Sequence, residues 1–127
     1  MTTILVVDDE FLIADLLATE LEDQGYRVLQ AHHGKKALEI LAHERPALIV
    51  TDFMMPLMNG LEMAQAIKSQ PQYRDLPIIL LSGAQGAIAR RYPELFAAVY
   101  DKPIELWRLS QAIRALIGPA RLAGEGG

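Results

Sequence analysis

Five short apolar runs divide this chain, and a longer amphipathic segment follows each of them. The runs are rich in β-branched residues and mostly continuous, which is typical of strands that are covered on both faces. A chain with this pattern is limited to folds in which a mainly parallel sheet is buried between helices. The expected strands cover residues 4–7, 26–30, 47–50, 78–81 and 97–100.

The segments between these runs predict helices. The fourth of them is the least regular, because Ala87 and Ile88 are its whole apolar face and Pro93 follows soon after. The first is followed by Gly25, a typical residue at a helix C-terminus. The expected helices cover residues 11–24, 34–43, 61–69, 84–91 and 104–117.

Two of the expected helices have a clear apolar face at helical spacing, which indicates the side that packs on the sheet. In the first helix this face consists of Leu12, Leu16, Leu17 and Leu21. In the last helix it consists of Leu106, Leu109, Ile113 and Leu116.

Five repeats of strand and helix predict an α/β fold with a doubly wound parallel sheet and helices on both faces, because crossovers between parallel strands are right-handed. The length of 127 residues suits one domain. We expect this domain to cover residues 1–118 and a short flexible tail to cover residues 119–127. Ligands of such folds bind at the carboxyl ends of the strands, so the residues there are the candidates for function.

Composition narrows the classes of function. The net charge of -4 gives no electrostatic support for binding nucleic acid. The chain has no cysteine, which excludes thiolate chemistry and fits a reducing compartment. No apolar stretch approaches the ~20 residues needed to span a bilayer, and the N-terminus has no basic segment before an apolar one. We therefore expect a cytoplasmic protein that binds neither membranes nor nucleic acid.

Acids, a hydroxyl and an ammonium stand just after four of the five expected strands. If these strand ends are neighbours, their carboxylates form a cluster of hard oxygens that suits Mg²⁺, and the cation relieves the repulsion among them. A nucleotide site is excluded, because acids after the first strand repel phosphates and the chain has no Walker A pattern. The residues are Asp8, Asp9 and Glu10 after the first strand, Asp52 after the third, Ser82 after the fourth and Lys102 after the fifth.

Asp52 opens a second informative stretch, in which Pro56 and Gly60 follow it. Proline and glycine at such positions punctuate a tight loop that leads into a helix. We expect this loop to present the Asp52 carboxylate and a backbone carbonyl to the pocket.

Taken together, these motifs resemble the receiver domain of two-component response regulators, of the chemotaxis-regulator type. The resemblance spans roughly residues 3–117 and rests on ordered motifs: the acid pair, Asp52 with its loop, Ser82, and Lys102 before Pro103. It implies a flavodoxin-like sheet with strand order 2-1-3-4-5.

The resemblance also implies the chemistry. Asp52 accepts a phosphoryl group from a histidine kinase, a histidine phosphotransfer protein or a small donor, so the chain is a signalling module rather than a turnover enzyme. Lys102 pairs with the phosphoryl oxygens, Ser82 donates a hydrogen bond to them, and the bond between Lys102 and Pro103 is cis. The Mg²⁺ cofactor is held by Asp9, by Asp52, by Asp8 through water, and by the backbone carbonyl of Met54.

Signal output in this family involves the surface of helix four, strand five and helix five, where an unknown downstream target or a second copy binds. Two features depart from the family pattern on this surface. Val99 stands where the family has an aromatic switch residue, and Tyr100 points to the opposite face because strand side chains alternate. The stretch from Ser82 to Lys102 is slightly shorter than usual, so we expect a short or irregular fourth helix.

Two other functions fit parts of the pattern. A Mg²⁺-dependent phosphatase of the haloacid-dehalogenase type also uses an aspartate nucleophile, but it needs Asp-x-Asp after the first strand, where Glu10 stands in place of the second acid. A receiver can also bind a partner without being phosphorylated.

Three polar residues near the strand ends are expected to have no role in the site. Glu10 is expected only to begin the first helix, and His32 and His33 are expected to be surface loop residues.

Overall fold

The structure is a computed structural model, and residues 1–120 of it are described. Five strands form one parallel sheet in the order β2-β1-β3-β4-β5, which confirms the expected topology. The strands are β1 (Thr3–Val7), β2 (Arg27–Ala31), β3 (Leu48–Asp52), β4 (Ile78–Ser82) and β5 (Ala98–Asp101). Most of the tail expected at residues 119–127 lies outside the described residues.

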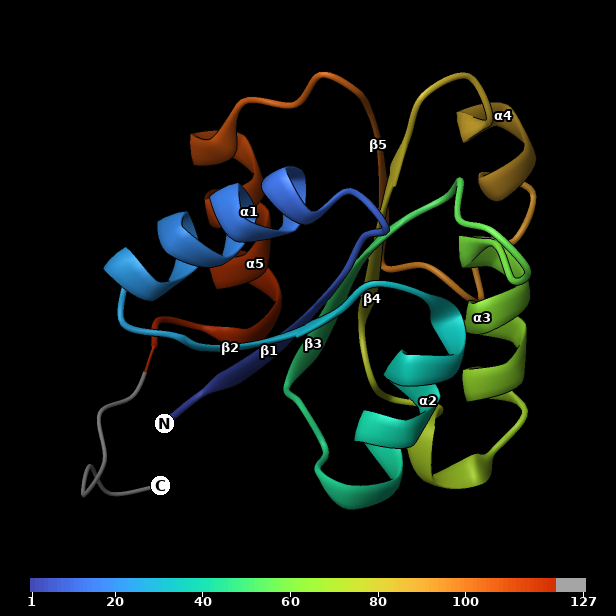
Figure 1. The fold of residues 1–127 in the computed structure, drawn as a ribbon, viewed down its shortest axis with the longest axis horizontal. Helices are drawn as coiled ribbons and strands as arrows, with labels where there is room; N and C mark the ends of the chain where they lie inside the picture. Colours follow the sequence, from blue (N-terminus) through green and yellow to red (C-terminus); the bar gives the residue numbers. More distant parts are fainter. Residues whose placement is uncertain (121–127) are drawn as a thin grey trace.

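Helices cover both faces of the sheet, as Figure 1 shows: α1 and α5 lie on one face, and α2, α3 and α4 lie on the other. A single 3-10 turn, η1, precedes β4. The helices are α1 (Phe11–Asp23), α2 (Gly34–His43), α3 (Gly60–Lys68), η1 (Pro71–Tyr73), α4 (Gly86–Ala89) and α5 (Leu106–Ile117). Among the described residues, none of these helices is long and apolar enough to cross a membrane.

The sheet separates two apolar cores, because successive side chains of a strand point to opposite faces. In β1, Leu5 and Val7 pack toward α2 and α3, while Ile4 and Val6 pack toward α1 and α5. Every residue of β1, β3 and β4 is buried. Continuous apolar runs in the sequence therefore correspond to strands that are covered on both sides.

The buried face of α1 differs from the expected one. Leu17 and Leu21 are buried as expected, but Leu12 is 84% exposed and Leu16 is 53% exposed. Ala14 and Ala18 take their places against the sheet. Small side chains there let the helix axis approach the strands closely, and positions 12 and 16 then point about half a turn away from the core.

The helices near the C-terminus also correct two expectations. The helix expected at 84–91 is a single turn of four residues, and its buried positions are Gly86 and Ala89 rather than Ala87 and Ile88. In α5, Leu109 and Ile113 are buried, whereas Leu116 is 42% exposed. Local spacing alone does not determine which side of these two helices is buried, because packing against the sheet selects that side.

Candidate functional site

Three acids meet at the carboxyl edge of the sheet. Asp8 follows β1 and Asp52 ends β3, and β1 and β3 are neighbours with Val7 opposite Thr51. Asp9 lies in the next position of the β1–α1 loop. Each of the three carboxylates offers an oxygen, and these oxygens all lie within 4.8 Å of one another. Such a set of hard oxygens fits a divalent cation such as Mg²⁺.

Burial makes this acid cluster unfavourable while all its members are charged. Asp8 is 1% exposed and Asp52 is 6% exposed. Burial raises the pKa of Asp8 to about 6, and the charges of Asp52 and Asp9 add to this rise. The backbone N–H of Glu10, which donates to Asp8 Oδ1 at 2.9 Å, and the charge of Lys102 oppose it. A cation would favour the ionised form of the cluster.

Lys102 brings the opposite charge to the site. Its Nζ lies 2.9 Å from Asp52 Oδ1 and 4.0 Å from Asp8 Oδ2. Burial alone would lower the pKa of Lys102, but the hydrogen bond to Asp52 and the charges of Asp52, Asp8 and Glu10 raise it overall. The bond between Lys102 and Pro103 is cis, as the family resemblance implies. The lysine is therefore charged and held against the acids.

Ser82 lies at the end of β4 and is fully buried. Its hydroxyl oxygen accepts a hydrogen bond from the backbone N–H of Gln85 at 3.0 Å. Its carbonyl accepts one from the backbone N–H of Lys102 at 2.7 Å. These bonds tie the β4–α4 loop and the end of β5 to the same residue.

The loop after Asp52 is held close to the site by Gly60 and a capping box. Gly60 N–H donates to the carbonyl of Phe53 at 2.8 Å. A Cβ on Gly60 would lie 2.5 Å from the carbonyl oxygen of Asp52, so only glycine fits there. Asn59 and Glu62 exchange the two hydrogen bonds of the capping box that begins α3. The role expected for the Met54 carbonyl stays a prediction.

Comparison with known proteins agrees with this geometry. A family model described as the response regulator receiver domain matches residues 4–114. The chain belongs to this family. It is a receiver domain of two-component response regulators, a family of domains that are generally signalling modules rather than turnover enzymes.

Curated relatives and solved structures of receivers resemble the chain closely. It is 38% identical to the response regulator MprA of Mycobacterium ulcerans over 122 residues, which are 94% of this chain and 51% of that protein. The chain thus spans about half the length of the curated relatives it matches. The signal receiver domain of a signal transduction histidine kinase from Syntrophus aciditrophicus is 30% identical, with a TM-score of 0.83, over 100% of this chain and 98% of that one. Chemotaxis protein CheY4 of Vibrio cholerae is 28% identical, with a TM-score of 0.84, over 91% and 98%.

The surface of α4, β5 and α5, which the family resemblance implies is used for output, has its own set of contacts. Val99 packs toward α2 and α3, whereas Tyr100 packs on the opposite face with the Arg108 guanidinium 5.8 Å from its ring. Tyr100 therefore does not occupy the aromatic position that Val99 leaves. Arg90 bonds the Val99 carbonyl at 3.2 Å and pairs with Asp101 at 3.4 Å, which joins α4 to β5.

His32 lies partly exposed in the loop after β2, in line with the expected surface loop, but it makes a contact that sequence reasoning missed. Its Nδ1 lies 3.2 Å from the carbonyl oxygen of Asp8. Its ring also lies against Phe11, with 3.8 Å between centroids and the ring planes tilted by 37°. A signal was available, because His32 follows the second strand at the same carboxyl edge, next to β1 in the implied strand order.

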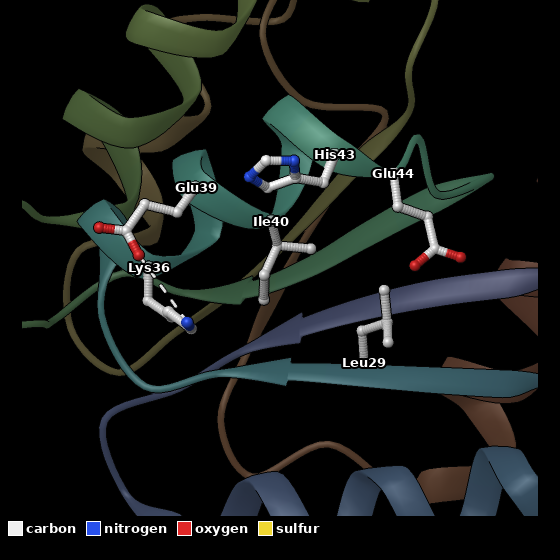
Figure 2. A pocket seen from close by; sticks show the side chains of 6 residues that line it. All are labelled: Leu29, Lys36, Glu39, Ile40, His43 and Glu44. Carbon is white, nitrogen blue, oxygen red and sulfur yellow. Dashed lines mark ion pairs between the residues drawn. The ribbon is translucent and has the colours of Figure 1, made fainter.

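The receiver also has a hollow away from the acid cluster. It lies between α2 and β2, holds about 360 Å³, and is lined by Leu29, Lys36, Glu39, Ile40, His43 and Glu44 (Figure 2). Lys36 and Glu39, three residues apart on α2, form an ion pair of 3.8 Å at its edge. Both of its glutamates are paired with cations, Glu39 with Lys36 and Glu44 with Arg27, so it lacks the cluster of acids beside an ammonium that the edge of the sheet provides.

Proposed function

We propose that this receiver domain is a phosphorylation-dependent signalling module that accepts a phosphoryl group on Asp52. One observation carries the proposal: Asp52 belongs to the acid cluster and is also the partner of Lys102, at 2.9 Å. The carboxylate thus has cation-binding oxygens beside it and an ammonium against it. Phosphoryl transfer depends on this kind of charge neutralisation around an aligned nucleophile.

Phosphoryl transfer to Asp52 is a displacement at phosphorus. A carboxylate oxygen of Asp52 attacks the phosphorus of a phosphohistidine, and the bond between phosphorus and the donor's imidazole nitrogen breaks. The electron pair of that bond stays on the nitrogen, and the donor ring, which is protonated on its other nitrogen, leaves as a neutral imidazole. Asp52 becomes an aspartyl phosphate. Mg²⁺ held by Asp9, by Asp52, by Asp8 through water and by the Met54 carbonyl would supply further neutralisation of the phosphoryl oxygens.

Ser82 and Lys102 are the residues that respond to the new group. Lys102 pairs with a phosphoryl oxygen, and Ser82 donates its hydroxyl hydrogen to another. A phosphoryl group adds about -1.5 to -2 charge units, which favours closure of both side chains on position 52. Because Ser82 carries the β4–α4 loop and Lys102 follows β5, closure changes the surface formed by α4, β5 and α5.

The proposal includes partners and location. The donor is a sensor histidine kinase or a histidine phosphotransfer protein, and the changed surface binds a downstream target or a second copy of this chain. The domain works in the cytoplasm, where phosphohistidine is made from ATP. It assists its own phosphorylation and dephosphorylation without turning over an external substrate.

Incubation with acetyl phosphate and Mg²⁺, followed by intact mass measurement, tests the proposal. We expect the wild type to gain the mass of one phosphoryl group and Asp52→Asn, which keeps the size of the side chain, to gain none. A wild type that gains no phosphoryl mass, or an Asp52→Asn variant that still gains it, would contradict Asp52 as the acceptor. Beryllofluoride mimics the phosphoryl group. If it leaves the affinity for a binding partner unchanged, the result would favour a receiver that acts without phosphorylation.

A further inference from the structure

The β1–α1 loop carries Asp9, the only member of the acid cluster that is partly exposed. This loop leads directly into α1, whose N-cap residue is Glu10. The Glu10 side chain makes no capping hydrogen bond to the first turn of the helix as described. The usual local device for fixing the start of a helix is therefore missing where the position of Asp9 is set.

His32 contacts the loop on both sides of Asp9. Its Nδ1 lies 3.2 Å from the carbonyl oxygen of Asp8, and its ring lies against the tilted ring of Phe11 with 3.8 Å between centroids. Asp8 N–H also donates to the carbonyl of Ala31, the residue before His32, at 3.0 Å. The end of β2 thus holds the residue before Asp9 and the second residue after it.

The contact to Asp8 fixes the position of a proton on the ring. A carbonyl oxygen can only accept, so His32 Nδ1 must carry the hydrogen. His33 shows the opposite arrangement, because its Nδ1 accepts a hydrogen bond from Lys36 N–H at 3.1 Å and must be bare. The two adjacent rings therefore differ in which nitrogen carries the hydrogen, and each arrangement reports one contact.

We propose that His32 is a positioning residue that holds the β1–α1 loop so that Asp9 faces Asp8 and Asp52 for cation binding. The role of His32 in cation binding rests on the proposed function, whereas its contact with the Asp8 carbonyl does not. Partners that orient metal ligands without touching the metal typically change metal affinity by about 10-fold or more when removed. His32 acts through the Asp8 backbone and the Phe11 ring rather than as a ligand.

Nitrogen NMR of the metal-free protein at mildly alkaline pH tests the contact directly. We expect His32 to be protonated on Nδ1 and His33 on Nε2. The common Nε2–H form at His32 would overturn the proposal, because that ring cannot donate to Asp8. This readout requires neither Mg²⁺ nor phosphorylation.

Mg²⁺ titration of variants tests the consequence. We expect His32→Ala to weaken Mg²⁺ binding by about 10-fold, and His32→Asn to recover part of the loss because its amide can still donate. His33→Ala is the matched control: it removes the N-cap of α2 and lowers the melting temperature, but leaves Mg²⁺ affinity unchanged. Hydrogen exchange of the Glu10 amide should rise in His32→Ala and stay near the wild-type value in His33→Ala.

The outcomes separate this inference from the proposed function. Wild-type affinity in a folded His32→Ala variant, or equal losses in His32→Ala and His33→Ala, would overturn the inference alone. Normal Mg²⁺ binding that depends on His32, without any phosphoryl adduct on the wild type, would overturn the proposed function alone. A wild type that binds no Mg²⁺ would contradict both.

Discussion

Asp8 shows how strongly one residue can connect the stability of the receiver to its chemistry. Its pKa is raised to about 6, first by burial and then by the charges of Asp52 and Asp9. The folded state holds this proton more tightly than the unfolded chain, where the ordinary value of 3.8 applies. Ionising Asp8 as the pH rises between these two values therefore lowers the free energy of unfolding, by roughly 2–3 kcal/mol.

Replacing this acid should stabilise the metal-free protein. We expect Asp8→Asn to raise the free energy of unfolding at neutral pH by about 2 kcal/mol, and this gain to be mostly lost near pH 4, where Asp8 is protonated in the folded wild type. Urea unfolding of both proteins at the two pH values measures the difference, in which the other carboxylates cancel. Equal stability of the two proteins at neutral pH would show that the folded state does not destabilise the ionised form of Asp8.

At the scale of elements, the β3–α3 connection depends on the missing side chain of Gly60. The closest atoms to a Cβ at this position are the Asp52 carbonyl oxygen at 2.5 Å and a methyl carbon of Leu80 at 2.8 Å. A backbone carbonyl cannot rotate out of the way as the end of a side chain can. Close approach of α3 to β3 is thus what fixes the loop around Asp52.

Adding a methyl group at Gly60 should therefore be costly. We expect Gly60→Ala to destabilise the protein by about 1–3 kcal/mol, as overpacking of a rigid site does, and to slow phosphorylation. Gly83→Ala is the control, because the nearest atom to its Cβ would be a side-chain oxygen of Gln85 at 4.0 Å. Chemical denaturation compares the two, and similar small losses would contradict the steric argument.

Helix α1 carries leucines on two opposite faces, and only one of them is in the core. Leu21 is 1% exposed, whereas Leu12 is 84% exposed. We expect Leu21→Ala to cost about 2–5 kcal/mol because it leaves a cavity, and Leu12→Ala to cost less than about 0.5 kcal/mol. Comparable losses in thermal or urea unfolding would mean that Leu12 is buried after all.

The sequence predicts the strands better than the buried face of α1. Strands covered on both faces are continuous apolar runs, so β1, β3 and β4 could be located to within about a residue or two at their ends. The face of α1 could not, because leucine spacing fits two sides and only the close approach to the sheet selects Ala14 and Ala18. The contacts of His32 and Arg90 likewise depend on side-chain placement across separate elements, which local spacing does not encode.

At the scale of the whole molecule, strand order creates the site. Since β1 lies between β2 and β3, the residues after β1 meet the end of β3 on one side and the end of β2 on the other. This is why Asp8, Asp9 and Asp52 could be expected together from the sequence once the order was inferred. The repulsion among the three acids at a buried edge is the cost that cation binding would offset.

Mg²⁺ should therefore stabilise the folded receiver. At a concentration of about 100 times its dissociation constant, a ligand that binds only the folded state adds about 2.7 kcal/mol. We expect Mg²⁺ to raise the melting temperature of the wild type, and Asp9→Asn to lose most of that rise. Asp15→Asn, which changes an exposed acid of α1, should keep it; an equal rise in all three proteins would indicate binding elsewhere.

The location of the phosphoryl group tests the central claim most directly. Borohydride reduces an aspartyl phosphate to homoserine, which peptide sequencing after proteolysis can assign to one position. We predict homoserine at position 52 in protein treated with acetyl phosphate and Mg²⁺, with Asp8 and Asp9 unchanged. Homoserine at position 8 or 9, or at no position in a protein that has gained a phosphoryl group, would contradict Asp52 as the acceptor.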